Sequence, residues 1–217
     1  IDYSNYLSSL YNSIILGSLV GFFCILVSIF INFYSRFSRN KKFLYYKKII
    51  NLGYAVPGVV IALGVLIFIK YINQFFYFTI LATLIGLILA LIIRLISISN
   101  NSIDSGLEKV GKSIDDASRL IGRRSSTTYF RIIIPQIRLS ILAGFLLVFV
   151  DTIKELPITL LLRPFNFDTL ATSLYEYSSN EMFENGSLHA LTIILFLSLV
   201  IYIFDSVIEK KQISKTR

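Results

Sequence analysis

One segment of the sequence carries the written pattern of a phosphate-binding loop. The stretch from Gly106 to Ser113 reads GLEKVGKS and so matches G-x4-G-K-[ST]. Such a loop works only where a buried β-strand leads into it and a helix N-terminus follows, because backbone N–H groups must converge on the phosphates. Here a long apolar run precedes the stretch, and the stretch itself continues a helical pattern. We predict that the match is coincidental and that the chain binds no nucleotide.

A second group of residues with chemical potential is charged and lies inside an apolar run. Asp151, Lys154 and Glu155 interrupt residues 139–162, and Pro157 follows them. A charge at membrane depth costs about 2.5–3.5 kcal/mol, so we expect these groups to face a bundle interior and to pair with one another or with a neighbouring helix. Their helical spacing predicts one shared face, and Pro157 predicts a kink.

Two interpretations of this charged face stay open. It can line a pathway or gate, or it can be a structural ion pair that locks the helix. Carboxylates suit hard cations, but Lys154 lies between Asp151 and Glu155, which argues against a dedicated metal cage. We therefore predict no metal site and no cofactor bound by this chain.

The remaining composition offers little to an enzyme. The 217 residues include one His and one Cys, so neither a paired nucleophile and base nor a His-rich metal cluster can be built. Hydrophobic residues make up 55% of the chain, and the mean hydropathy is +0.71. A soluble domain of this length cannot bury so much apolar surface. We therefore expect a membrane protein rather than an intramembrane or soluble enzyme.

Five apolar runs are long enough to cross about 30 Å of hydrocarbon as helices. Helices satisfy their own backbone hydrogen bonds, which lipid cannot do. The predicted fold is all-α: a polytopic bundle of about five transmembrane helices in a single domain spanning residues 1–217. The second run contains Pro57 and Gly58, which mark a kink or a close helix contact, with gating as a further interpretation. The runs cover residues 10–34, 52–72, 76–98, 139–162 and 188–205.

Basic residues alternate sharply between the connections. Seventeen of the 21 Lys and Arg residues lie in three segments, residues 35–48, 100–138 and 210–217. By the positive-inside rule these segments are cytoplasmic, so the N-terminus is outside and the C-terminus inside. The net charge of +8 therefore fits membrane topology better than a nucleic-acid surface. The sequence begins at Ile1, without Met and without a signal-peptide pattern, so we expect either a part of a longer chain or a trimmed form of the protein.

The connection at residues 100–138 is organised as two short helices joined at a glycine. Apolar residues recur at helical spacing across residues 107–121, namely Leu107, Val110, Ile114, Ala117 and Ile121. Gly122 interrupts this stripe, and a second amphipathic stretch from Tyr129 stops at Pro135. The segment is either a solvated connector or a docking element that presents an apolar stripe to a cytoplasmic partner.

A spacing within this connection resembles the EAA loop of binding-protein-dependent ABC permeases. That family's pattern is E-A-A, three residues, G, nine residues, I-x-L-P. The sequence has Asp116-Ala117-Ser118 in the first positions, Gly122 at the glycine and residues 132–135 (IIIP) at the end. The departures are Asp for Glu, Ser for Ala and Ile for Leu. The resemblance implies that the residues which couple to an ATPase are Asp115, Asp116, Ala117, Ser118, Gly122, Ile132 and Pro135.

Two other stretches resemble ferric iron permeases: residues 54–64 (YAVPGVVIALG) and residues 154–172, which begin KELP. Permeases of that group usually carry two such halves, and this chain looks like the second half. The resemblance implies a pathway in the bacterial inner membrane, cytoplasmic ATPase subunits that bind the ATP, a periplasmic binding protein, and either a second permease half or a homodimer. The implied cargo is iron(III).

Other functions remain as alternatives to iron(III) import. Related permeases that share the EAA loop move other small solutes, such as thiamine, a polyamine or a phosphonate. A secondary transporter or channel would need no coupling loop but would be expected to show inverted repeats, and the two halves of the sequence are not self-similar. We expect the acidic excess of residues 163–187 either to meet a binding protein or to be a solvated face.

Overall fold

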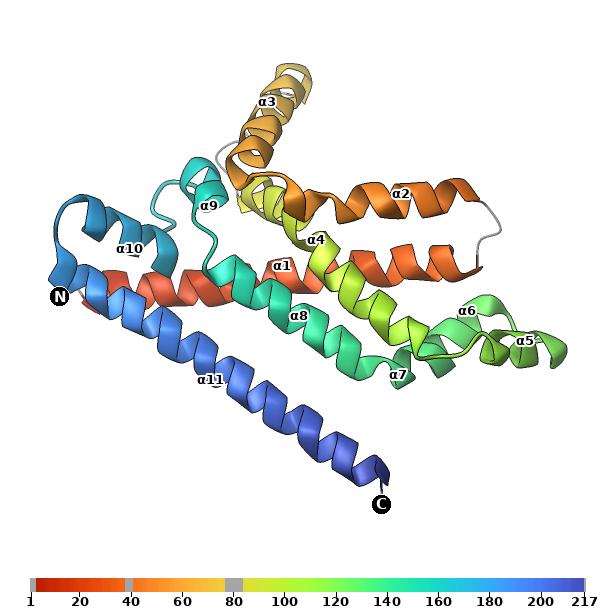
Figure 1. Cartoon of the computed structure of the whole chain (residues 1–217). Coiled ribbons are helices and arrows are strands. Elements are labelled where there is room, and N and C mark those ends of the chain that lie inside the picture. Colours follow the sequence, from red (N-terminus) through yellow and green to blue (C-terminus); the bar gives the residue numbers. More distant parts are fainter. Residues whose placement is uncertain (1–2, 38–40, 77–83, 217) are drawn as a thin grey trace.

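A computed structural model describes residues 3–37, 41–76 and 84–216, and every regular element among them is helical (Figure 1). This confirms the all-α prediction. In chain order the elements are α1 (Tyr3–Phe37), α2 (Lys41–Asn51), η1 (Gly53–Ala55), α3 (Gly58–Phe76), α4 (Leu84–Glu108), α5 (Ser113–Leu120), α6 (Ser125–Thr128), the π-helical turn η3 (Tyr129–Ile133), α7 (Ile134–Gln136), α8 (Arg138–Ile153), α9 (Pro157–Leu162), α10 (Leu170–Ser179) and α11 (Phe183–Thr216).

Three helices are long and apolar enough to cross a membrane alone: α1, α4 and the Phe183–Ser206 part of α11. Two further pairs meet the same test together but are bent. Lys47–Ala55 joins Gly58–Gln74 at 116°, and Ser125–Gln136 joins Arg138–Ile153 at 73°. Counting each bent pair as one span gives five, which is the predicted number, although the second pair begins at Ser125, within the connection predicted to be cytoplasmic.

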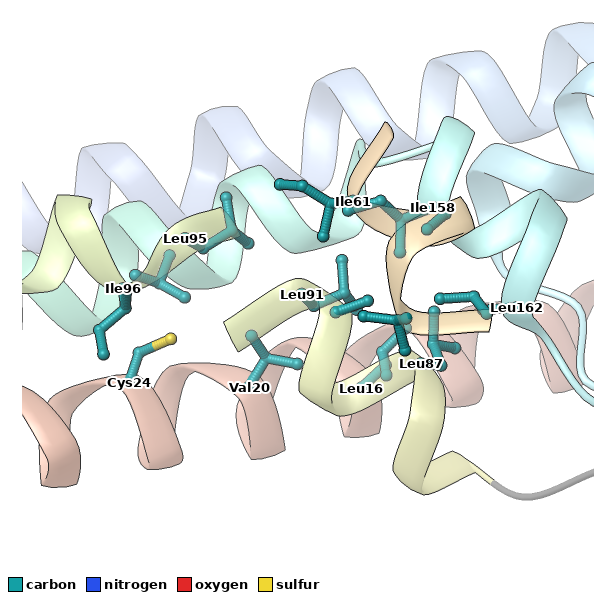
Figure 2. Close-up of a cluster of buried hydrophobic side chains, with 14 of the residues drawn as sticks. Leu16, Val20, Cys24, Ile61, Leu87, Leu91, Leu95, Ile96, Ile158 and Leu162 are labelled. Carbon is teal, nitrogen blue, oxygen red and sulfur yellow. The ribbon is translucent and has the colours of Figure 1, made fainter. Parts of the chain in front are cut away.

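Helices α1, α4 and α8 pack against one another and form the centre of the bundle (Figure 1). Glycines bring α1 close to α8, because a Cβ on Gly17 would lie 2.9 Å from the Phe149 ring and one on Gly21 would lie 2.8 Å from the Phe145 ring. Small residues permit such close approach between membrane helices. The core between α1 and α4 extends to α3 and α9 (Figure 2), and its buried members include Leu16, Val20, Cys24, Ile61, Leu87, Leu91, Leu95, Ile158 and Leu162.

Two polar contacts join α1 to α4 within this packing. The hydroxyls of Ser28 and Ser99 lie 2.7 Å apart, and the Asn32 amide donates to Asn100 Oδ1 at 2.7 Å. All four side chains are buried. Hydrogen bonds of this kind fix the register of packed helices where lipid offers no partner.

The two ends of the bundle carry different elements. The start of α1, α10 and the start of α11 lie together at one end, whereas the end of α1 lies at the other end with α5, α6 and α7 (Figure 1). The predicted cytoplasmic connection therefore gathers at the end opposite the N-terminus. This arrangement is the one that the predicted orientation requires.

The structure corrects three predicted boundaries. The third run, predicted for residues 76–98, is represented by α4, which continues to Glu108; residues 77–83 lie outside the described residues. The cytoplasmic connection, predicted from residue 100, therefore leaves the helix only after Glu108. The fourth run is not one helix, since α8 ends at Ile153 and α9 begins at Pro157. Its apolar composition is continuous, which hid the break.

Candidate functional site

Helix α5 holds the first residues of the EAA-like spacing and presents two unlike faces. Asp116 and Ala117 are exposed, as are Leu120 and Ile121, whose relative exposures are 88% and 70%. Asp115 and Ser118 are buried against the rest of the protein. The predicted coupling residues are therefore divided. Asp116 and Ala117 are available to a partner, whereas Asp115 and Ser118 hold the helix in place.

Gly122 ends α5 through its backbone conformation. Its φ is +72°, in the left-handed region, and a Cβ there would meet nothing within 4 Å. The Gly122 N–H donates to Arg119 O at 2.9 Å, and the Arg123 N–H donates to Ser118 O at 3.0 Å. These two bonds form a Schellman motif, the common glycine-dependent end of a helix. Gly122 is needed here for its positive φ and not for space.

Arg36, at the end of α1, clamps α5 to the bundle. Its Nε donates to Asp115 Oδ2 at 2.8 Å, and each of the two side chains is only 9% exposed. Its two terminal nitrogens donate to the carbonyl oxygens of Leu107, Val110 and Gly111 at 3.1–3.3 Å. One guanidinium therefore joins α1, the end of α4 and the start of α5. The charge pattern predicts only that Arg36 is cytoplasmic, and its position just after the first apolar run is the one sequence feature that points to a contact with the connection.

The stripe predicted to run as one helix through residues 107–121 is broken. Helix α4 ends at Glu108 and α5 starts at Ser113. Leu107 and Val110 belong to an inner cluster with Tyr129 and Ile133, whereas Ala117 and Ile121 are exposed. The break contains Gly111, and Arg36 donates hydrogen bonds to the carbonyl oxygens of Val110 and Gly111 there. The segment with the phosphate-loop pattern is thus the end of α4 and the turn before α5. A helix and not a β-strand leads into it, as predicted, but the prediction that the helix continues through the segment is wrong.

The second half of the motif packs behind α5. The hydroxyls of Ser118 and Thr128 lie 2.7 Å apart and join α5 to α6. Ile132 is half-buried and Pro135 is exposed. The helical path was predicted to stop at Pro135, but α7 includes this proline near its start and the 73° bend follows at Ile137. Proline fits the first turn of a helix, where its missing N–H would have no intrahelical partner.

The charged residues of the fourth run do not share one face. Lys154 pairs with Asp151 at 2.7 Å, and its side chain is 57% exposed, whereas the Glu155 side chain is 8% exposed. The helix ends at Ile153, so the 100° step that predicted a common face does not continue to Lys154 and Glu155. Pro157, predicted to kink a continuing helix, instead occupies the start of α9.

Glu155 lies where two helix breaks meet. Its Oε1 accepts from the Ile158 N–H at 3.3 Å, at the start of α9, and lies 3.7 Å from Arg94 Nη1 on α4. A Cβ on Gly58, at the start of α3, would lie 2.1 Å from Arg94 Nη1 and 3.0 Å from Glu155 Oε1. The Pro57-Gly58 pair therefore lies at the 116° bend and also allows a close contact. A carboxylate at helix N-termini is favoured by the helix dipole.

Arg94 is held less completely than Arg36. Its guanidinium lies 6.0 Å from the centre of the Tyr54 ring, within cation–π range. Its Nε and Nη1 are buried and make no hydrogen bond within the described part of the chain. The 3.7 Å ion pair between Arg94 and Glu155 is thus a single long contact that joins α4 to the break before Gly58 and to the break after Ile153. The described residues contain no group of three or more His, Cys, Asp or Glu placed to hold a metal ion.

Comparison with known proteins was made for the sequence and for the fold. A family model described as "Binding-protein-dependent transport system inner membrane component" matches residues 13–214. The Fe(3+)-transport system permease protein FbpB 2 of Haemophilus influenzae is 26% identical over 203 residues, which are 93% of this chain and 39% of that protein. The ferric transport system permease protein FbpB of Actinobacillus pleuropneumoniae is 29% identical over 119 residues, or 54% of this chain and 17% of that protein.

Two solved structures share the fold. A chain of the MetNI methionine ABC transporter, solved in inward-facing conformations, has a TM-score of 0.74 at 12% identity, with 94% of each chain covered. A chain of an amino acid ABC transporter crystallised with histidines has a TM-score of 0.70 at 21% identity, covering 96% of this chain and 94% of that one. At these identities the likeness concerns the fold alone. This chain thus spans well under half of the ferric relatives but matches these solved chains over nearly their full length.

Proposed function

The chain belongs to the family of binding-protein-dependent transport system inner membrane components, and from this premise we propose that it forms the transport pathway of an ATP-driven importer. It is a multi-pass protein of the inner membrane and a permease by family, not an enzyme. In the proposal, separate cytoplasmic ATPase subunits bind and hydrolyse the ATP. A periplasmic binding protein delivers the cargo to the outer end of the bundle.

The observation that carries the proposal is the exposed face of α5. Asp116, Ala117, Leu120 and Ile121 project at the end of the bundle predicted to be cytoplasmic. Exposed apolar side chains beside a charge suit insertion into a groove of another protein. The Arg36 contacts fix the start of α5 and the Gly122 turn fixes its end. Helix α5 is therefore a rigid handle, meaning an element that a partner can move as one piece together with α1.

The arrangement of helices around Glu155 supports the proposal of a gate, which opens when movement of α5 is transmitted to the bundle. The helices on either side of the two breaks that meet here, one before Gly58 and one after Ile153, can reorient as rigid bodies, a common form of switching in membrane proteins. The Arg94–Glu155 contact holds the two breaks together in the present conformation. Asp151, Lys154 and Pro157 border the same junction. A structural ion pair that does not move remains the competing role for this junction.

Iron(III) is the proposed cargo, because the ferric permeases are the relatives that match by sequence. Thiamine, a polyamine and a phosphonate are the competing cargoes, because related permeases for other solutes share the EAA loop. The pathway is completed either by a second permease half or by a second copy of this chain. A secondary transporter or channel is disfavoured by α5, which would have no role there.

The test is uptake of radiolabelled ferric iron into vesicles that hold this permease with the ATPase and binding protein of the same transport system. Uptake should require ATP and should not be diminished by excess thiamine, polyamine or phosphonate. Leu120→Asp, on the exposed face of α5, should abolish uptake and ATPase retention, whereas Met182→Asp at the opposite end should retain the ATPase. Retention of the ATPase by Leu120→Asp would contradict the role of α5, and competition by another solute would reassign the cargo.

A further inference from the structure

An isolated aromatic side chain projects at the end of the bundle opposite α5. Phe165 has a relative exposure of 99%, whereas Phe167, two residues later, packs against the main core. Both residues belong to the connection between α9 and α10. A single exposed apolar side chain is common on protein surfaces, so a partner is indicated here by the fixed backbone and the polar surroundings of Phe165.

The turn that carries Phe165 is a defined β-turn. The Phe167 N–H donates to Pro164 O at 3.2 Å, which places Phe165 and Asn166 at the two central positions. Asn166 has a φ of +60°, in the left-handed region that asparagine adopts more readily than most residues. Phe167 then anchors the far side of the turn in the core. The backbone therefore holds Phe165 outward in one direction.

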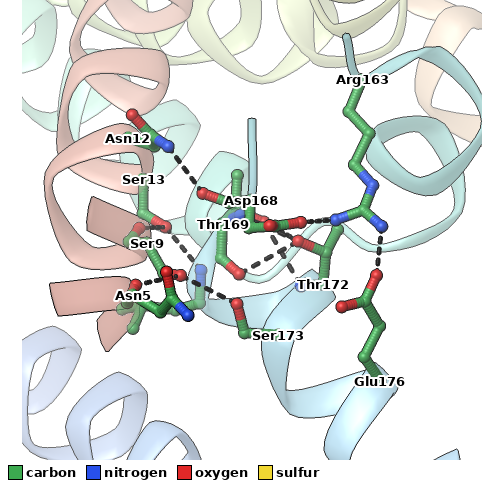
Figure 3. A network of polar contacts seen from close by, with 11 residues as sticks. Asn5, Ser9, Asn12, Ser13, Arg163, Asp168, Thr169, Thr172, Ser173 and Glu176 are labelled. Carbon is green, nitrogen blue, oxygen red and sulfur yellow. Dashed lines mark hydrogen bonds and ion pairs between the residues drawn. The ribbon is translucent and has the colours of Figure 1, made fainter. Parts of the chain in front are cut away.

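A polar network fixes this turn to α1 and α10 (Figure 3). Arg163, directly before the turn, pairs with Asp168, directly after it, and with Glu176 on α10. The Asn12 amide donates to Asp168 O at 2.9 Å, and the Leu170 N–H donates to Ser13 Oγ at 2.8 Å. A fixed turn lowers the entropy that binding would otherwise cost.

The surroundings of Phe165 are polar and carry an excess of acid. A hollow of about 420 Å³ adjoins the turn and is lined by groups that include Asn5, Asn166, Asp168 and Glu176. Glu181 and Glu184 are exposed at the same end of the bundle. Arg163 alone offsets these four carboxylates among residues 163–187. An aromatic anchor within a polar rim is the usual composition of a protein-binding hot spot.

We propose that the Phe165 turn, residues 163–168, is the anchor by which this permease receives its cargo-loaded binding protein. Phe165 enters an apolar pocket of that protein, and a basic rim around the pocket faces Asp168, Glu176 and the hollow. The proposal rests on the proposed function, because it requires a binding-protein partner on the outer side. A lipid surface is the less suitable occupant, since clustered carboxylates are repelled by anionic headgroups.

Affinity for the binding protein tests the proposal in the reconstituted permease with its ATPase. Phe165→Ala should raise the Kd for the cargo-loaded binding protein by at least about 20-fold, the usual size for a central anchor. Tyr175→Ala, an exposed aromatic on α10 outside the turn, should change the Kd by less than about 3-fold. Equal changes of the Kd in the two variants would overturn the proposal that Phe165 is the anchor. Absence of binding by the unaltered permease would instead overturn the proposed function.

Fluorescence separates the competing occupants, because the chain contains no Trp. Phe165→Trp supplies a single probe and keeps an aromatic anchor, so the Kd should stay within about 3-fold of that of the unaltered permease. Its emission, taken as the difference from the same mixture with the unaltered permease, should shift to shorter wavelength when the binding protein is added. Quenching by brominated lipid before that addition would assign the turn to the membrane and overturn the proposal. So would a blue-shifted emission that depends only on permease concentration, which would assign the turn to a second copy of the chain.

Discussion

Two arginines of the bundle are held in opposite ways. Arg36 makes four contacts of 2.8–3.3 Å, all from one guanidinium that is almost entirely covered. Arg94 makes one ion pair at 3.7 Å and leaves two buried nitrogens without hydrogen bonds among the described residues. The first arginine locks α5 to α1 and α4, and the second loosely joins two helix breaks. The difference indicates that α5 is held rigidly at one end of the bundle, whereas the Arg94–Glu155 contact inside the bundle can separate.

Removing the Arg36 clamp should have the largest effect. Arg36→Ala leaves Asp115 buried without its cation, and breaking a buried pair costs about 3–5 kcal/mol. Thermal unfolding in detergent should show the loss, and ATP hydrolysis in vesicles should continue with little uptake because α5 no longer carries α1 with it. Asp115→Asn is the milder control, since it keeps a hydrogen-bond acceptor. Normal uptake per ATP in Arg36→Ala would show that the Arg36 contacts do not transmit the movement of α5 to α1.

Weakening the Arg94–Glu155 contact should have the next largest effect. Glu155→Gln keeps an oxygen for the Ile158 N–H but removes the charge that faces Arg94. A loss of about 1.4 kcal/mol would raise the population of the separated form about tenfold. Leak of cargo through vesicles in the absence of ATP is the measurement. Glu184→Gln, which alters an exposed carboxylate of α11 away from this junction, should leak like the unaltered permease, and equal leak from both variants would contradict a gate at Glu155.

Replacing Gly122 should have a moderate effect. Gly122→Ala forces a side chain into the left-handed region and should destabilise the turn after α5 by about 1–2 kcal/mol. Gly64→Ala is the matched control, because Gly64 lies inside α3 with open space at its Cβ position, and alanine favours a helix. Melting temperatures should fall for the first variant and hold or rise for the second. The reverse order would show that Gly122 does not act through its backbone.

Lys154→Ala should have the smallest effect on stability. The Lys154 side chain is more exposed than buried, and an exposed pair contributes about 0–1 kcal/mol. We still predict reduced uptake, because Lys154 borders the gate, while assembly with the ATPase is retained. Uptake at the unaltered rate would separate Lys154 from the pathway and leave it a local partner of Asp151.

The predictable parts of the fold were those that a local pattern reports. Hydrophobic runs gave the spans, and the EAA-like spacing located α5 and the left-handed Gly122. The roles of Arg36 and Arg94 could not be predicted, because their partners lie about 60–80 residues away in the chain. The break after Ile153 was also hidden, since the apolar run continues through it. Pro157 was interpreted as a kink for the same reason, although proline is as well suited to start a helix.

The central claim is that α5 moves rigidly with α1 while the breaks at Glu155 and Gly58 change their separation. It is tested by distance measurements between pairs of spin labels after the single natural cysteine, Cys24, is replaced by Ala. A pair at Ser35→Cys and Ala117→Cys should keep one distance distribution with and without ATP in the assembled transporter. A pair at Val60→Cys and Leu161→Cys should shift when ATP is added. A shift in the first pair with no change in the second would contradict the claim.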